Sequence, residues 1–247
     1  MPIDRNRGTR QDLVFVAVIL LPLIILVGIL IYFPAIDSLI TSFTNENLRI
    51  RRLPKFIGLK NYSKLIENSE FWIVTARSLL VVSLTLPLEL LISLSLALLL
   101  TEAFPGRAMV RTLILLPWML PPIVNGFLWG WLLNGEYGAL NGLLYQMGII
   151  DEYVTWLRNP DTQVIWVVVV QTWTRFAFPT IILLAGLQSI PKDLLDAAKV
   201  DGASSWQSFK NIVLPLLMPS FAVALTIEFI ASFQIFDVIW TLTAGGS

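Results

Sequence analysis

Five apolar runs, each long enough to cross the hydrocarbon core of a membrane, dominate this 247-residue chain. A helix needs about 20 apolar residues to span the roughly 30 Å of hydrocarbon in a bilayer. The runs that reach this length lie at 13–33, 78–100, 112–133, 163–187 and 212–236. Because a backbone inside lipid must satisfy its own hydrogen bonds, such runs predict helices. We therefore expect an all-α, polytopic transmembrane helix bundle that forms one domain over residues 1–247.

The composition removes several classes of function. Lysine and arginine together number 17, as do aspartate and glutamate, so no net charge favours nucleic acid as a partner. The chain has no cysteine and no histidine, which removes thiol chemistry, the commonest general base and the commonest metal ligands. The run at 13–33 is longer than the apolar core of a signal peptide, and no A-x-A cleavage site follows it. We expect this run to be kept as a membrane anchor.

The distribution of basic residues gives an orientation. With the N-terminus in the cytoplasm, the inside segments carry eight lysines and arginines and the outside segments carry seven. Six of those seven lie in one long loop, and long loops cross membranes with less regard to charge. We therefore expect a multi-pass protein of a bacterial or archaeal cytoplasmic (inner) membrane, with its N-terminus in the cytoplasm.

A polar stretch at 188–211 interrupts the apolar sequence and would face the cytoplasm. Pro191 suits the first turn of a helix, and Gly202 can adopt the left-handed conformation that ends one. Ser204 and Ser205 can each cap a following helix that enters the last run. The pattern predicts a helix, a glycine corner and a second helix, with a small-residue face open to another protein. That face consists of Ala197, Ala198 and Ala203.

The sequence DAAKVDGASSWQSFKNIVLP, at 196–215, resembles the EAA motif of ABC-importer permease subunits. In that motif an acidic residue and two alanines precede a glycine, and I-x-L-P follows nine residues later. The matching positions here are Asp196, Ala197, Ala198, Gly202, Ile212, Leu214 and Pro215, with Asp201 and Ala203 on either side of the glycine. Aspartate replaces the usual glutamate and keeps its charge.

The resemblance covers nearly the whole chain. The stretches FIGLKNYSKLIENSEFW (56–72), FPGRAMVRTLILLPWMLPPIV (104–124) and GALNGLLYQMGI (138–149) look like the carbohydrate-uptake branch, similar to the maltose and glycerol-phosphate permeases. The end of the chain resembles that branch's F-D…T-x-G-G-P, with Ser247 in place of the proline. The resemblance implies a type I importer fold with six core spans, so a sixth span is expected beyond Ser247.

The resemblance also implies partners and a mechanism. In this family the 188–211 elbow is a coupling helix that docks on a cytoplasmic ATPase subunit. The sequence contains no G-x-x-x-x-G-K-[ST] motif, so ATP and Mg are expected on two separate ATPase subunits, with no cofactor on this chain and no enzymatic activity of its own. One elbow per chain implies a second, homologous permease in a heterodimer, together with an extracytoplasmic solute-binding protein and a sugar-type solute.

Polar and aromatic residues inside the runs are candidates for the solute path. Ionisable groups in a span are costly to insert and usually face a cavity or a partner. Indole and phenyl faces can stack on sugar C–H groups, and amides can bond hydroxyls. The candidates are Glu89, Trp118, Asn125, Gln171, Arg175, Phe178, Glu228, Gln234 and Asp237. A structural pairing of Glu89 with Arg175 is the alternative for those two, and helix packing is the alternative for the others.

Two other classes of function compete with an ATP-driven importer. An ion-gradient-driven secondary transporter for a small polar solute would be expected to show internal repeats with broken spans in matching halves, and none is visible. A lipid-linked glycosyltransferase would need an acidic cluster at the membrane surface, whereas the loops carry only scattered carboxylates. The importer subunit is the function we expect.

Overall fold

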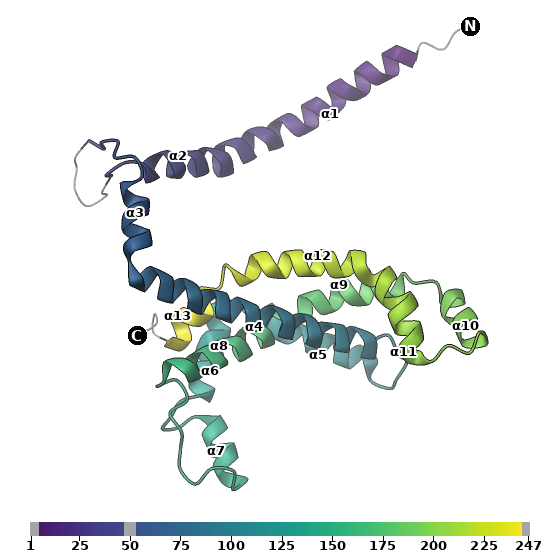
Figure 1. The fold of residues 1–247 in the computed structure, drawn as a ribbon. Helices are drawn as coiled ribbons and strands as arrows, with labels where there is room; N and C mark the ends of the chain where they lie inside the picture. The colour runs from purple at the N-terminus through teal and green to yellow at the C-terminus, as the bar shows by residue number, and fades with distance from the viewer. Residues whose placement is uncertain (1–4, 47–52, 244–247) are drawn as a thin grey trace. The chain divides into compact units, whose positions relative to one another are not determined.

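Helices make up almost all regular structure in residues 5–46 and 53–243, the part of the chain that the computed structural model describes (Figure 1). The single β contact within these residues is an isolated bridge between Thr44 and Phe56. The expected all-α architecture is confirmed. The chain divides into two compact units, Met1–Val74 and Thr75–Ser247.

The first unit contains one long apolar helical segment. Its helices are α1 (Arg5–Val27), a π-helical turn (Gly28–Tyr32), α2 (Phe33–Ser42) and α3 (Lys60–Glu67). Within Phe15–Ser42 no residue is buried inside the chain, and side chains such as Phe15 and Phe33 are about two-thirds exposed. A helix that is apolar all round and uncovered needs lipid or another protein against it.

Hydrogen bonds hold α3 against the C-terminal end of α2. The side-chain amide of Asn61 donates to the carbonyl oxygens of Ser42 and Thr44, each at 2.8 Å. The hydroxyl groups of Ser42 and Tyr62 lie 2.6 Å apart. These contacts satisfy carbonyls at the C-terminal end of α2 that have no partner within the helix.

The second unit is a helix bundle. Its helices are α4 (Ser69–Leu99, which begins in the first unit), α5 (Arg107–Met119), α6 (Pro122–Leu132), α7 (Ala139–Gln146), α8 (Pro160–Arg175), α9 (Ala177–Gln188), α10 (Lys192–Val200), α11 (Ser205–Ser208), α12 (Leu214–Ser232) and α13 (Asp237–Thr243). Within this unit α10 and α11 lie at one end, and α13 lies at the other (Figure 1).

Three continuous helical segments of the described chain are long and apolar enough to cross a membrane: Phe15–Ser42, Ser69–Leu99 and Ser205–Ser232. The runs expected at 112–133 and 163–187 are instead bent pairs. α5 and α6 meet at 96°, and α8 and α9 meet at 46°. Counting each bent pair as one span gives up to five, the number expected from the sequence.

Prolines explain both bends. Leu120, between α5 and α6, is extended (φ −81°, ψ 138°), as expected for a residue that precedes a proline. Pro121 follows it and offers no N–H to the carbonyl of Pro117. In α9, Pro179 likewise has no N–H for the carbonyl of Arg175.

Both π-helical turns occur in the same register before a proline. The turn at Gly28–Tyr32 is followed by Phe33 and then Pro34, and the turn at Phe209–Val213 is followed by Leu214 and then Pro215. A proline ring crowds the carbonyl four residues before it. A π turn moves the hydrogen bonding one residue further back, which relieves that crowding without ending the helix.

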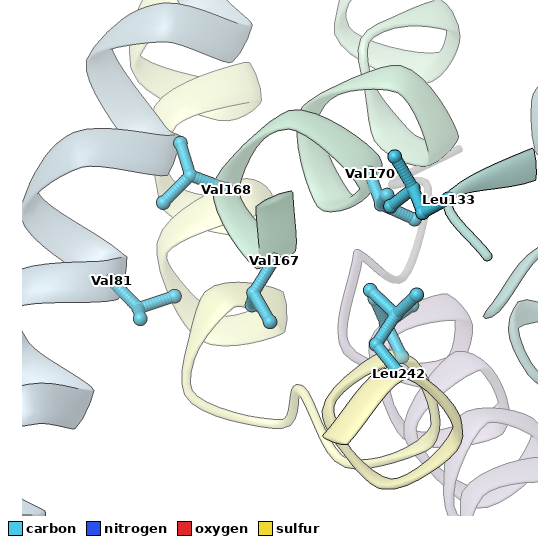
Figure 2. Packing of buried hydrophobic residues seen from close by; sticks show 7 residues of the cluster. Val81, Leu133, Val167, Val168, Val170 and Leu242 are labelled. Atoms are coloured by element: carbon cyan, nitrogen blue, oxygen red, sulfur yellow. The ribbon is translucent and has the colours of Figure 1, made fainter. Parts of the chain in front are cut away.

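Two apolar clusters hold the second unit together. One contains Val81 of α4, Leu133 after α6, the valines of α8, and Val238 and Leu242 of α13. Figure 2 shows Leu133, Val170 and Leu242 directed toward one another. The other cluster joins α4, α9 and α12 through residues such as Leu90, Leu183 and Leu217. Apolar packing therefore holds α9 and α12, the helices before and after the elbow, against α4.

Candidate functional site

The elbow begins with α10, and a Schellman motif ends this helix. Asp201 caps the helix, and Gly202 follows with φ +79°. The backbone N–H of Ala203 donates to the carbonyl of Ala198 at 2.9 Å, and that of Gly202 donates to Lys199 at 3.1 Å. Glycine is favoured here because other residues are strained at this positive φ. The predicted glycine corner is confirmed.

The second arm of the elbow runs into the membrane without a break. Ser204 accepts a hydrogen bond from the N–H of Gln207, and the Gln207 side chain accepts one from the N–H of Ser204, which forms a capping box. From Ser205 the helix continues through the π turn to Ser232 as a single 28-residue segment. Of the two candidate serines, Ser204 is the cap. The second arm of the elbow and α12 therefore form one continuous helix.

The surface of the elbow differs from the small-residue face expected from the sequence. Ala197 is exposed, but Ala203 is half-buried and Ala198 is 7% exposed, because it packs inside the chain. Asp196 forms an exposed ion pair with Lys199 at 3.0 Å, a kind of pair that contributes little to stability.

Three apolar side chains protrude from the elbow instead. They are Leu194, Val200 and Trp206, which are 45%, 87% and 68% exposed. Trp206 also stacks on Phe209, with ring centroids 5.6 Å apart. Sequence reasoning overlooked these residues, although apolar residues within an otherwise polar stretch were the signal that could have identified them.

The remaining motif positions lie at the membrane entry. Ile212 belongs to the π turn, and Leu214 and Pro215 are the first two residues of α12. Pro215 therefore lies inside the continuous helix, where the π turn before it relieves the crowding by its ring.

Three ionisable residues meet between α4, α8 and α12. The Nε of Arg175 lies 3.0 Å from Oε2 of Glu228, whose side chain is 1% exposed. Glu89 is fully buried, and both of its carboxyl oxygens have no hydrogen-bond partner among the described residues. Glu89 interacts electrostatically with both other residues. The alternative pairing of Arg175 with Glu89 is therefore replaced by a pairing with Glu228, because α12 brings this second carboxylate within hydrogen-bond distance.

Four of the proposed path residues line one cavity of about 130 Å³ between α8 and the segment that joins α12 to α13. They are Gln171, Arg175, Gln234 and Asp237. Among the described residues, the side chains of Gln171, Gln234 and Asp237 form no hydrogen bond. Pro122 and Phe236 contribute apolar surface to the same cavity. The cavity therefore combines amide, carboxylate and apolar groups.

Asn125 lies in the α5–α6 bend. It is fully buried, and its Nδ2 donates to the carbonyl of Pro117 at 2.9 Å. That carbonyl has lost its helical partner because residue 121 is a proline. The oxygen Oδ1 of Asn125 has no partner among the described residues. Asn125 therefore completes the hydrogen bonding of the bend and does not line the 130 Å³ cavity.

Trp118 and Phe178 stack on each other, with ring centroids 5.6 Å apart and an angle of 26° between the rings. A spacing of seven residues would place Trp118 and Asn125 on one face of a continuous helix. The 96° bend instead separates them onto different helices, so they do not share a face.

A buried polar centre near α7 was not anticipated. Asn141 is fully buried, and its side chain bonds the backbone of Asn134 and Val154 and the indole N–H of Trp156. An asparagine that bonds backbone groups of two loops fixes their geometry. Its position within the G-A-L-N-G stretch gave no clear signal of this role.

Residues 89–247 match the model of the family described as binding-protein-dependent transport system inner membrane component. The chain belongs to this family. It is therefore a permease subunit of an ABC importer and a multi-pass protein of the inner membrane. The fold and family expected from the sequence are confirmed.

The chain is similar to permeases of known systems. It is 37% identical to the trehalose/maltose transport system permease protein MalF of Thermococcus litoralis, over 92% of this chain and 76% of that protein. It is 34% identical to the sulfoquinovosyl glycerol transport system permease protein SmoG of Agrobacterium fabrum, over 95% of this chain and 76% of that protein.

Solved structures support the same fold. The chain matches a crystal structure of a bacterial ABC transporter that imports the acidic polysaccharide alginate, with a TM-score of 0.76 and 24% identity, over 96% of this chain and 82% of the other. A second structure of an alginate transporter, in complex with a pentasaccharide-bound periplasmic protein, matches with a TM-score of 0.73 and 25% identity, over 97% and 82%.

Proposed function

We propose that this permease pairs with a homologous second permease to form the path for a sugar or related polyol, driven by two cytoplasmic ATPase subunits. The observation that carries the proposal is the elbow, in which α10 turns at Gly202 into a helix that is continuous with a span. An ATPase that grips α10 would move the end of α12 as one lever. One elbow serves one ATPase subunit, so a pair of ATPase subunits requires a second permease.

The exposed apolar side chains of the elbow are the contact we propose for the ATPase. Leu194, Val200 and Trp206 would be buried in a groove of that subunit, and the charged residues around them would remain at the rim. ATP and Mg would be held by the ATPase subunits, since this sequence contains no phosphate-binding loop of the Walker type. On this proposal the elbow and the N-terminus lie in the cytoplasm.

The cavity between α8 and α12 is the part of the solute path that we assign to this chain. Gln171 and Gln234 offer donors and acceptors to hydroxyl groups, and Asp237 offers an acceptor. Two relatives support a carbohydrate solute by name: the trehalose/maltose permease and, at 36% identity, a permease named for starch degradation products. Glu89, Trp118, Asn125 and Phe178 stay predictions as path residues. An extracytoplasmic binding protein would deliver the solute.

Reconstitution tests the proposal. The two permeases and the ATPase are co-purified, placed in proteoliposomes and supplied with the solute-binding protein. We expect two distinct permease bands, and uptake that requires ATP and is unaffected by collapse of ion gradients. Uptake that follows an ion gradient without ATP would contradict the proposal, and a single permease band with full activity would contradict the heterodimer.

A further inference from the structure

The charges around the 130 Å³ cavity do not leave a free cation. Arg175 is the one basic residue among the described residues that line it, and its guanidinium is bonded to Glu228 at 3.0 Å. Asp237 adds a negative charge on the cavity wall. Glu89 lies within electrostatic range of the same arginine. The net charge of these four side chains is therefore not positive, whether Glu89 is charged or neutral.

A solute with a carboxylate or sulfonate would lose its hydration on entering such a cavity. Burying an anion is costly unless a positive partner compensates it. Among the described lining residues the one guanidinium already has a carboxylate partner, so an anion would have to share Arg175 with Glu228 and would add a further negative charge beside that buried carboxylate. Asp237 would repel the anion as well.

The uncommitted groups of the cavity fit hydroxyl groups instead. Gln171 is 6% exposed, and neither its amide nor that of Gln234 is bonded to a described residue. Each amide provides both donors and acceptors, and the Asp237 carboxylate accepts from hydroxyls. Phe236 and Pro122 provide the apolar surface on which sugar C–H groups pack.

We infer that the path takes an uncharged carbohydrate and excludes acidic sugars, with Glu228 setting this selectivity by neutralising Arg175. The inference rests on the proposed function, and it specifies the charge of the solute, which the family does not fix. Glu228 acts through the arginine, so it is a positioning residue whose charge sets the selectivity.

Equilibrium binding to the complex of both permeases and the ATPase, in the absence of the solute-binding protein, measures the selectivity of the path itself. The probes are maltotriose, which is uncharged, and trigalacturonic acid, which carries carboxylates. The wild-type complex should bind trigalacturonic acid about tenfold more weakly or worse. Glu228→Gln should leave the positive charge of Arg175 uncompensated. The ratio of the affinity for maltotriose to the affinity for trigalacturonic acid should then fall about tenfold. Glu228→Asp keeps the charge and is the matched control, with the wild-type ratio expected.

Asp237→Asn provides a second variant that leaves the ion pair intact. It should also reduce the preference for maltotriose. If Glu228→Gln fails to assemble, Asp237→Asn still tests the charge selectivity of the cavity. Equal or tighter binding of trigalacturonic acid by the wild type, or an unchanged ratio in these variants, overturns the inference. ATP-driven uptake of trigalacturonic acid would overturn this inference but would leave the proposed function standing. Loss of all ATP-driven uptake in the complete system would instead contradict the proposed function.

Discussion

Arg175 of α8 and Glu228 of α12 are joined by a 3.0 Å ion pair that links the segment before the elbow to the segment after it. Because α12 is continuous with the second arm of the elbow, we expect a movement of the elbow to reach Glu228. The same arginine lines the 130 Å³ cavity. The pair therefore connects the helix that carries the proposed ATPase contact to the cavity of the proposed solute path.

Removing one member of this pair should destabilise the protein strongly. Arg175→Met leaves the nearly buried Glu228 without its partner, which costs about 3–5 kcal/mol in comparable buried pairs. The double variant Arg175→Met/Glu228→Leu removes both charges and should recover most of that loss. Thermal unfolding of the detergent-solubilised protein measures both effects. A double variant no more stable than Arg175→Met would show that the pair is not the cause.

Gly202→Val should uncouple the ATPase without unfolding the spans. A Cβ at Gly202 meets no atom within 4 Å, so the cost comes only from the positive φ of +79°, at about 1–3 kcal/mol of backbone strain. The elbow would relax by changing its angle. We expect reduced assembly with the ATPase, or reduced ATP hydrolysis coupled to uptake, with normal membrane insertion.

Gly148→Val is the matched control for Gly202→Val. Gly148 follows α7, has φ +69° and likewise has no atom within 4 Å of an added Cβ. It should suffer similar strain while leaving ATPase coupling intact. Equal loss of coupling in both variants would contradict the assignment of the elbow, since a general folding defect would then explain Gly202→Val.

Asn125→Leu should mainly lower stability and assembly, whereas Gln171→Leu should mainly lower uptake. Asn125 bonds the carbonyl of Pro117 in the bend, so its loss should lower stability by about 1–3 kcal/mol and reduce assembly. Gln171 faces the cavity, so its loss should lower uptake about tenfold with normal assembly. Uptake and assembly are compared in the same preparations. Normal stability with lost uptake in Asn125→Leu would instead support the prediction that this residue lines the path.

Local patterns predicted the elbow well. The proline, the glycine and the serine caps act over one or two turns, so their effects can be derived from neighbouring residues alone. The glycine corner and the capped second arm are both present, with Ser204 as the cap. The exposure of Ala198 could not be derived in this way, because it depends on packing against the rest of the chain.

Relations between helices were less predictable. The spacing of Trp118 and Asn125 defines a common face only if the helix is continuous, and consecutive prolines turned the segment by 96°. The sequence suggests Glu89 as the alternative partner of Arg175, whereas the structure pairs this arginine with Glu228. Glu89 and Glu228 are both acidic residues within spans, and only the rotation and depth of α12 decide which of them lies within hydrogen-bond distance.

Gly186 should be required for the close approach of α9 and α12. A Cβ at this position would lie 2.7 Å from the Cβ of Ser220, so the helices must separate or shift. Overpacking of this kind costs about 1–3 kcal/mol. Gly186→Ala should therefore lower the temperature of thermal unfolding, even though alanine favours a helix more than glycine does.

Two variants complete that experiment. Gly28→Ala is the control, because Gly28 is also helical and an added Cβ there meets no atom within 4 Å; it should be neutral or slightly stabilising. Ser220→Gly removes the colliding side chain, so the double variant Gly186→Ala/Ser220→Gly should regain part of the stability lost in Gly186→Ala. If Gly186→Ala instead unfolds at the same temperature as Gly28→Ala, contact between α9 and α12 at this point does not limit the stability of the bundle.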